Sequence, residues 1–213
     1  MSNFPDCKLI DCEQRTESWY LARKGHLTAS QFGDWLTKTG KVADKACLTA
    51  ASKCLAELAG YPDPPPFETD DMRRGVELEP EARDAFQIYT GLTVDQIGFA
   101  KSKHGYFGCS PDGLILSGSA GLEIKCPRPS KLIQYIANDE LPEEYKPQVH
   151  GSMAVTGAKE WHFFAYCPGF PFFHILTKRD DYTERMLEGL KSYSAYFASL
   201  AAQMEELKQE QAA

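Results

Sequence analysis

Four short, β-rich segments punctuated by glycine stand in the middle of this chain, and they limit the folds that it can adopt. They are LTVDQIGFA (92–100), GYFGCS (105–110), DGLILSG (112–118) and GLEIKC (121–126). Runs of this length bounded by glycine are typical of strands joined by tight turns. A meandering sheet is therefore predicted in this part of the chain.

Helical patterns lie on both sides of these strands. Before them, the apolar spacing predicts helical turns around 18–23 and 28–36 and longer helices over 44–59 and 68–90. After them, it predicts helices over 129–138 and 143–156, strands over 161–167 and 170–177, and an amphipathic helix over 181–210. Pro80 should kink or split its helix. These elements predict an α/β protein with a central mixed sheet, flanking helices and a long C-terminal helix.

The length of 213 residues predicts a single domain over residues 1–213, with an N-terminal arm over 1–16 and a C-terminal helix over 181–213. The apolar stripe of that helix could pack on the sheet or form a subunit contact. No window is apolar and long enough to cross a membrane, and the N-terminus lacks a signal-peptide pattern. A cytoplasmic protein without a membrane partner is therefore expected.

The charge balance and the cysteines exclude several kinds of site. Acids outnumber bases by 30 to 23, which argues against a broad basic face for nucleic acid but leaves room for one local groove. The seven cysteines contain no C-x2-C pair, so reduced thiols are expected and a structural zinc site is disfavoured. Cys47 and Cys54 are interpreted as small buried hydrophobes.

Two acids and one lysine have the most informative spacing. Asp112 opens one predicted strand, and Glu123 and Lys125 lie two residues apart on the next, so they face one side of it. A hairpin around SGSAG would bring all three together. Two close carboxylates repel each other unless a cation lies between them, and such hard ligands suit Mg²⁺ or Mn²⁺. The lysine could steer a water toward phosphorus. A solvated charged face on an edge strand is the alternative.

Five pieces of sequence occur in an order that resembles one nuclease family. They are ESWYLARKGHLTASQFGDWL (17–36), MRRGVELEPEARDAF (72–86), SPDGL, GLEIKCP and YKPQVHGSMAVTGAKEWHFFAY (145–166). Together they resemble the lambda-exonuclease family, also called YqaJ-type viral recombinases, within the PD-(D/E)XK nucleases. The resemblance covers about residues 17–180, and it implies a restriction-endonuclease-like core.

The resemblance implies a Mg²⁺-dependent 5′-to-3′ exonuclease. Such an enzyme digests one strand of linear double-stranded DNA from a 5′-phosphorylated end and leaves a 3′ single-strand overhang for recombination by strand annealing. It implies two Mg²⁺ ions per site, with Mn²⁺ as a substitute. The implied partners are DNA, two further copies in a homotrimeric ring and a single-strand-annealing protein. A phage or prophage protein acting in a bacterial cytoplasm is implied as well.

The resemblance also assigns roles to the residues of the catalytic site. The metal ligands would be Asp112, Glu123 and the Ile124 carbonyl, while the catalytic lysine would be Lys125. Glu79, in G-x-x-x-E-x-x-A-R, matches an upstream acid that completes the site, and Gln148 matches a glutamine of the following helix. As an alternative, Glu79 could pair with Arg83 at i,i+4, which would leave Glu77 or Glu81 as the acid.

A pocket for the terminal 5′-phosphate is implied in the same way. Its members would be Arg23, Ser30 and Ser110, with Lys131 where the family prototype has an arginine. Lysine keeps the charge but loses the bidentate fork. Contacts to the DNA backbone are predicted for Arg73, Arg74 and Arg128, together with Lys131. Alternatively, Ser30 could cap a helix, Ser110 could shape a turn and Arg23 could be a plain surface charge.

Other prominent side chains are interpreted as structural. The five histidines lack ligand spacing to a second histidine, and an aromatic cluster is assigned to the core: Trp161, Phe163, Phe164, Phe172 and Phe173. Three other functions stay open. They are an endonuclease or junction resolvase on the same core, a non-catalytic DNA-binding relative, and an iron–sulfur relative, for which the chain lacks a C-terminal cluster of three cysteines.

Overall fold

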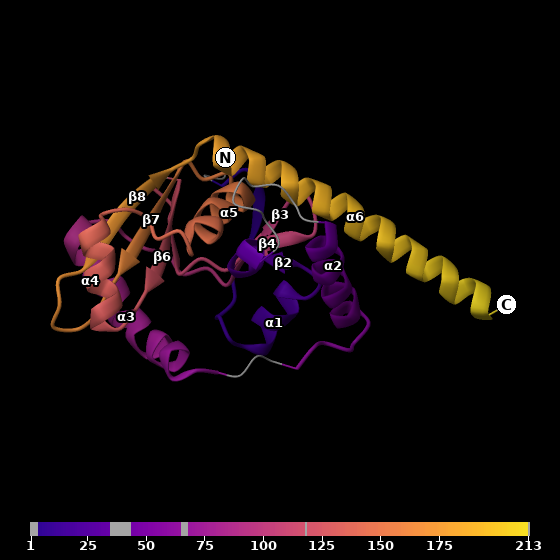
Figure 1. Ribbon diagram of the computed structural model, residues 1–213, viewed down its shortest axis with the longest axis horizontal. Coiled ribbons are helices and arrows are strands. Elements are labelled where there is room, and N and C mark those ends of the chain that lie inside the picture. Colours follow the sequence, from indigo (N-terminus) through magenta and orange to yellow (C-terminus); the bar gives the residue numbers. More distant parts are fainter. Residues whose placement is uncertain (1–3, 35–43, 65–67, 118, 213) are drawn as a thin grey trace.

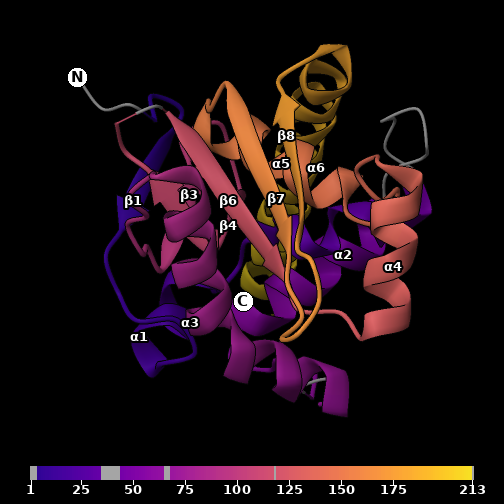
Figure 2. The same cartoon turned by 90° about the vertical axis from the view of Figure 1, so that its left-hand side faces the viewer.

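Two four-stranded sheets form the centre of the molecule (Figures 1 and 2). The structure is a computed structural model that describes residues 4–34, 44–64, 68–117 and 119–212. The first sheet has the order β1-β3-β4-β2: β1 (Cys7–Ile10), β3 (Phe99–Ser102), β4 (Phe107–Cys109) and β2 (Leu27–Thr28). The second follows the chain: β5 (Gly113–Ile115), β6 (Ala120–Lys125), β7 (Glu160–Ala165) and β8 (Phe173–Lys178).

The predicted meander is divided between these two sheets. β3 and β4 belong to the first sheet and β5 and β6 to the second, so the single meandering sheet is wrong. The strand predicted over 92–100 is also shorter, because regular pairing begins only at Phe99 and Asp95 makes an isolated bridge to Leu114. The N-terminal arm contains β1, which pairs with β3.

The second sheet is mixed, and its first two strands form the predicted hairpin. β5 and β6 are antiparallel, with Gly113 opposite Leu122, whereas β6 and β7 are parallel. β7 and β8 are antiparallel again. The Asp112 N–H donates to the Leu122 carbonyl (3.2 Å), which extends the hairpin by one residue. This register places Asp112 at the end of β5 that lies beside the last residues of β6.

Helices cover both sheets (Figure 1). They are α1 (Glu17–Arg23), the 3₁₀ turn η1 (Ala29–Asp34), α2 (Asp44–Leu58), α3 (Asp70–Thr90), α4 (Pro129–Asn138), α5 (Lys146–Thr156) and α6 (Asp181–Ala212). Thr69 caps α3 by accepting a hydrogen bond from the Met72 N–H, and Gly91 ends it with a left-handed φ of 69°. Trp35 and Leu36, predicted at the end of a helical turn, lie outside the described residues.

α3 bends along its length, as Pro80 predicted, but it is not split (Figure 2). The helix is continuous from Asp70 to Thr90, although Pro80 lacks the N–H that would bond to the preceding turn. Ala82 and Phe86 are completely buried on the second half of the helix, where they pack on the second sheet. This apolar burial offsets the loss of one backbone hydrogen bond, because tertiary packing supplies most of the stability of a helix in a protein.

The core confirms most of the structural assignments. Trp161, Phe163, Phe164 and Phe173 are buried, whereas Phe172 is 37% exposed and is not a core residue. Cys47 and Cys54 are buried, and none of the seven cysteines, all of which are described, forms a disulfide. His162 and His174 stack on each other, with Nδ1 and Nε2 2.9 Å apart, so this pair is in contact although no ligand spacing suggested it. Among the described residues, no helix is both long and apolar enough to span a membrane.

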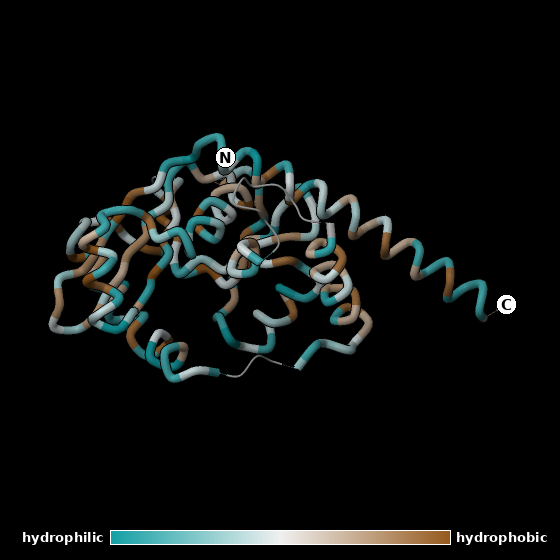
Figure 3. The backbone as a smooth tube through the Cα atoms, in the orientation of Figure 1, coloured by the Kyte–Doolittle hydropathy of each residue, from teal (hydrophilic) through white to brown (hydrophobic). Residues whose placement is uncertain are grey.

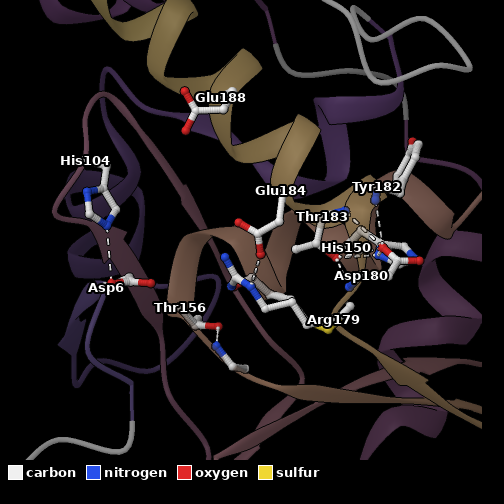
Figure 4. Close-up of polar contacts among 12 residues, drawn as sticks. Asp6, His104, His150, Thr156, Arg179, Asp180, Tyr182, Thr183, Glu184 and Glu188 are labelled. Atoms are coloured by element: carbon white, nitrogen blue, oxygen red, sulfur yellow. Dashed lines mark hydrogen bonds and ion pairs between the residues drawn. The ribbon is translucent and has the colours of Figure 1, made fainter.

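α6 is anchored to α5 at its first turn and projects from the body at its C-terminal end (Figures 1 and 3). His150 of α5 contacts the Thr183 hydroxyl (2.7 Å), and Asp180 accepts from the Thr183 N–H (3.1 Å) (Figure 4). Burial along α6 continues to Phe197, whereas Met204 is 46% exposed. The anchored turn fixes α5, the helix that carries Gln148.

Gly121 in β6 should be essential for packing against Trp161. A Cβ on Gly121 would lie 2.3 Å from the ring of the fully buried Trp161. We expect Gly121→Ala to lower the free energy of unfolding by about 1–3 kcal/mol through overpacking. Gly75→Ala is the matched control, because its Cβ would meet nothing within 4 Å and alanine favours a helix by about 1 kcal/mol. Urea denaturation measures both variants, and a neutral Gly121→Ala would contradict the packing described here.

Candidate active site

Asp112, Glu123 and Lys125 meet at the end of the β5–β6 hairpin. Lys125 Nζ lies 2.5 Å from Glu123 Oε1, and Asp112 Oδ2 accepts a hydrogen bond from the Ile124 N–H at 2.6 Å. Gln148 Nε2 donates to Glu123 Oε1 from α5 at 2.7 Å. The structure thus brings together four of the side chains named from the sequence, and a solvated face on an edge strand does not describe them, since Glu123 is only 2% exposed.

Two buried carboxylates and one lysine determine the electrostatics of this group. Desolvation and the Glu123 carboxylate raise the pKa of Asp112 well above its ordinary value, against the influence of Lys125 and of the Ile124 N–H. Desolvation likewise raises the pKa of Glu123, and Lys125 opposes it. Burial alone would lower the pKa of Lys125, but Glu123 and Asp112 reverse this and raise it. The lysine compensates only part of the cost of two neighbouring buried carboxylates.

Glu79 approaches the same point from α3. Its Oε1 accepts from Arg83 Nη2 (2.5 Å) and its Oε2 from Arg15 Nη2 (3.2 Å). The i,i+4 pair with Arg83 therefore forms, but it does not remove Glu79 from the site. Of the three acids weighed on this helix, Glu79 alone lines the cleft that also contains Asp112, while Glu81 accepts from the Tyr166 hydroxyl.

The cleft has a volume of about 560 Å³ and lies between α1, α3 and the end of β6. Its charged lining includes Arg15, Glu79, Asp112 and Lys125, and Ile124 borders it as well. Aromatic and apolar side chains complete the walls: Trp19, Tyr20, Met72, Val76 and Tyr145. Glu68 and Asp71 line the cleft as well. A cleft of this size with charged and apolar walls can accommodate a nucleotide-sized group.

The predicted phosphate-binding residues form a second cluster next to this cleft. Ser110 Oγ accepts from Trp19 Nε1 (2.9 Å) and from Arg23 Nη1 (3.3 Å). Arg23 also reaches Thr28 Oγ1 (3.5 Å), which is 3.4 Å from Ser30 Oγ. Arg23 thus contacts Ser110 directly and is linked to Ser30 through Thr28, and Ser110 lies two residues before Asp112 in the chain. Desolvation lowers the pKa of Arg23, and Glu57 opposes this, so Arg23 is more than a plain surface charge.

The remaining predicted cations lie apart from that cluster. Lys131 on α4 pairs with Glu144 (3.2 Å) and has no contact with Arg23, Ser30 or Ser110, all of which are described. Arg73 pairs with Asp70, and Arg128 pairs with Asp71 at 2.7 Å, both near the surface. Arg74 donates to the Cys126 and Pro127 carbonyls and to Cys167 Sγ, so it is committed to the protein backbone rather than open to DNA.

Four residues of the candidate site were not predicted from the sequence. Trp19 stacks under Arg23, with 4.0 Å from Cζ to the ring centroid, and Tyr145 lies 4.9 Å beneath Lys125 Nζ. Arg15 and Arg83 hold Glu79. Trp19 and Arg83 lie in motifs from which other residues were assigned to the site. Arg15 lies in no such motif, and its position depends on a left-handed φ of 68° that the sequence does not predict.

The donor set fits a hard divalent cation. Among the described residues, no group of three or more His, Cys, Asp or Glu side chains has an arrangement that could hold a metal ion. Asp112 and Glu123 nevertheless supply two carboxylates, and desolvation is the largest cause that raises the pKa of each. With the Ile124 carbonyl and water, these oxygens are the ligand type of Mg²⁺.

Comparison with solved structures defines the class of the protein. The alkaline exonuclease LHK-Exo from Laribacter hongkongensis matches at 33% identity with a TM-score of 0.75, over 92% of this chain and 98% of its own. The same exonuclease in complex with dAMP matches at 32% identity, with the same score and coverage. A phage-related exonuclease from Haemophilus somnus 129PT shares the fold at 16% identity, with a TM-score of 0.60 over 84% and 96% of the two chains. The predicted α/β fold is confirmed as that of exonucleases.

The family follows from the sequence model that the chain matches. Residues 18–159 match the YqaJ-like viral recombinase domain. The protein belongs to the YqaJ-like viral recombinase family, as the order of its motifs predicted. Among curated proteins, none matches the chain significantly. Homology to exonucleases supports the prediction of a nuclease.

Proposed function

We propose that this protein is a Mg²⁺-dependent 5′-to-3′ exonuclease that digests one strand of linear double-stranded DNA. The observation that carries the proposal is the convergence of Asp112, Glu123 and Lys125 beside a cleft that Asp112 and Lys125 line. Two adjacent carboxylates and an amine are the groups that metal-assisted phosphodiester hydrolysis needs. The exonuclease relatives support the choice of an exonuclease over other nucleases.

Each residue of the site has a distinct task in this proposal. Asp112, Glu123 and the Ile124 carbonyl would hold Mg²⁺, with two ions per site and Mn²⁺ as a substitute, and Glu79 would contribute a second-ion or water-mediated contact. Bound Mg²⁺ supplies neutralisation of the charge that develops on the scissile phosphate. Lys125 orients the attacking water, and Gln148 fixes the Glu123 carboxylate through its 2.7 Å hydrogen bond.

The Arg23 cluster would give the enzyme its direction. A metal site of this kind has no inherent polarity, so another feature must select the terminus. Arg23, Ser110 and Ser30 are linked by hydrogen bonds beside the cleft, and a terminal phosphate could accept charge-assisted bonds from them. Lys131 joins this pocket only if its pair with Glu144 opens, so its contribution is smaller.

Arg23→Ala should reduce the preference for a 5′-phosphate. We expect the wild-type enzyme to digest a 5′-phosphorylated duplex faster than a 5′-hydroxyl duplex, because the dianion accepts more charge-assisted hydrogen bonds. The variant should bring this rate ratio close to one on short substrates while keeping a similar peak rate. Lys8→Ala, on the exposed edge of β1, is the charge-matched control. An unchanged ratio in Arg23→Ala would remove Arg23 from the pocket.

The wider setting follows from the same proposal. The product strand would be a 3′ single-strand overhang that a strand-annealing protein takes up for recombination, as part of a phage or prophage system in a bacterial cytoplasm. The dAMP complex of the Laribacter relative supports a nucleotide ligand for this chain. A homotrimeric ring around the duplex would explain a projecting α6, whose far end leaves Met204 and Leu207 exposed.

Linear and covalently closed duplexes distinguish the proposal from its closest alternative. The exonuclease should release nucleotides from the linear DNA when Mg²⁺ is added and should leave the closed circle intact. An endonuclease or junction resolvase with the same metal site would cut the circle. Absence of any Mg²⁺-dependent product from both substrates would support a non-catalytic DNA-binding relative instead.

A further inference from the structure

Arg83 connects the two elements that carry Glu79 and Asp112. Its Nη2 donates to Glu79 Oε1 (2.5 Å), and its Nε donates to the main-chain carbonyl of Asp112 (3.1 Å). When the Gln96 amide is oriented with its oxygen toward Arg83, that oxygen accepts a further hydrogen bond from Arg83 Nη2 (3.2 Å). The Arg83 side chain is 10% exposed. One buried guanidinium therefore ties α3 to the start of β5.

Arg83 does not reach the substrate cleft. Glu79 and Asp112 line two neighbouring cavities, the cleft described above and a polar cavity of about 400 Å³. Arg83 lines the second cavity and is not among the described residues that line the cleft. Its contacts are to Glu79 and to the Asp112 backbone, so its effect on the reaction is expected to pass through these two residues.

Arg15 contacts the same carboxylate in a different way. It donates only to Glu79 Oε2 (3.2 Å), its side chain is 49% exposed, and it lines both cavities. A half-exposed pair of this kind contributes little and exchanges easily with solvent. The two arginines therefore allow a comparison at one carboxylate, since only Arg83 also holds Asp112.

We infer that Arg83 is a positioning residue that sets the spacing between Glu79 and Asp112 and so determines how tightly the site binds divalent cations. The inference rests on the proposed metal-dependent function. Its physical basis is the rigid fork of the guanidinium, which satisfies two acceptors at a fixed separation. Lysine keeps the charge but offers a flexible point donor, so Arg83→Lys should hold one partner and release the other.

Metal binding without DNA provides a measurement independent of turnover. The full-length protein is titrated with Mn²⁺, and the free ion is followed by electron paramagnetic resonance, for wild type, Arg83→Lys and Arg15→Lys. We expect Arg83→Lys to bind Mn²⁺ about 10- to 100-fold more weakly, which is the usual effect of losing a partner that orients a metal ligand. Arg15→Lys should stay within about fivefold of wild type.

Kinetic measurements then distinguish a loss of metal-ligand positioning from a general loss of folded protein. In Arg83→Lys, the Mg²⁺ concentration for half-maximal digestion should rise by about the factor lost in Mn²⁺ affinity, while the rate at saturating Mg²⁺ largely recovers. Thermal denaturation of each variant shows whether it is folded. Arg83→Gln, which retains donors without a charge, replaces Arg83→Lys should the lysine variant fail to fold.

The outcomes distinguish this inference from the proposed function. If wild type binds no Mn²⁺ and digests no DNA, the proposed function fails. If wild type does both but the Arg83 variant binds Mn²⁺ with an affinity within fivefold of wild type, the positioning role is overturned. The same conclusion holds if the variant differs from wild type only in a lower melting temperature. Equal losses in the Arg83 and Arg15 variants would also overturn it, because they would reflect the Glu79 charge pair alone.

Discussion

Asp112→Asn is expected to abolish digestion of DNA and to leave the fold intact. Asparagine keeps the shape of the side chain and an oxygen that can accept from the Ile124 N–H, now 2.6 Å from Asp112 Oδ2. It removes a carboxylate whose pKa is raised by desolvation and by the neighbouring Glu123 carboxylate. Stability should therefore hold or rise, while the site loses a charged metal ligand.

The expected loss of catalytic rate in Asp112→Asn can be estimated from the transition-state stabilisation that a bound metal ion contributes. Bound metal supplies several kcal/mol of transition-state stabilisation, and about 1.4 kcal/mol corresponds to a factor of ten. A fall of at least about 100-fold is therefore expected in the rate of nucleotide release at saturating Mg²⁺. Glu123→Ala should behave likewise. Asp95→Asn, beside β5 but outside the cleft lining, is the control. Substantial activity in either active-site variant would mean that the catalytic site lies elsewhere.

Lys125→Ala should lose turnover while retaining DNA binding. The Lys125 amine lies 2.5 Å from Glu123 Oε1 and 4.9 Å from the centre of the Tyr145 ring, so it is held at the junction of the carboxylates and the cleft wall. Positioned groups that act on water or on transition-state charge contribute about 10²-fold or more. The loss should appear in the catalytic rate rather than in affinity.

Two assays separate catalysis from binding at Lys125. DNA affinity is measured with Ca²⁺ in place of Mg²⁺, and single-turnover digestion is measured with Mg²⁺. Lys178→Ala, at the exposed end of β8, controls for the loss of one positive charge. A Lys125→Ala enzyme that binds poorly but cleaves normally once bound would identify this lysine as a phosphate anchor.

The sequence was most informative where local rules decide the structure. The spacing of Asp112, Glu123 and Lys125 required only a hairpin, and the β5–β6 register provides it. The i,i+4 relation of Glu79 and Arg83 is fixed by helical geometry alone. For the same reason the limits of α3 and α6 were predicted closely, since capping and apolar periodicity are local signals.

Features that depend on distant contacts could not be predicted in this way. The division of the strands into two sheets follows from pairing between segments far apart, such as β1 with β3. Arg83 gains a second partner, besides Glu79, from the Asp112 backbone, 29 residues away in the chain. Lys131 and Arg74 were grouped with DNA contacts by charge, yet their partners Glu144 and the Cys126 carbonyl come from other elements.

A linear duplex with distinct labels at the two ends of one strand tests the central claim most directly. One strand carries a 5′-phosphate and a 3′ fluorophore, and digestion is followed with Mg²⁺ and with excess chelator. We expect mononucleotides to leave from the 5′-phosphorylated end only when Mg²⁺ is present, while the 3′ label stays on shortening fragments and the complementary strand survives as an overhang. Early release of the 3′ label, or equal digestion with the chelator, would contradict the central claim.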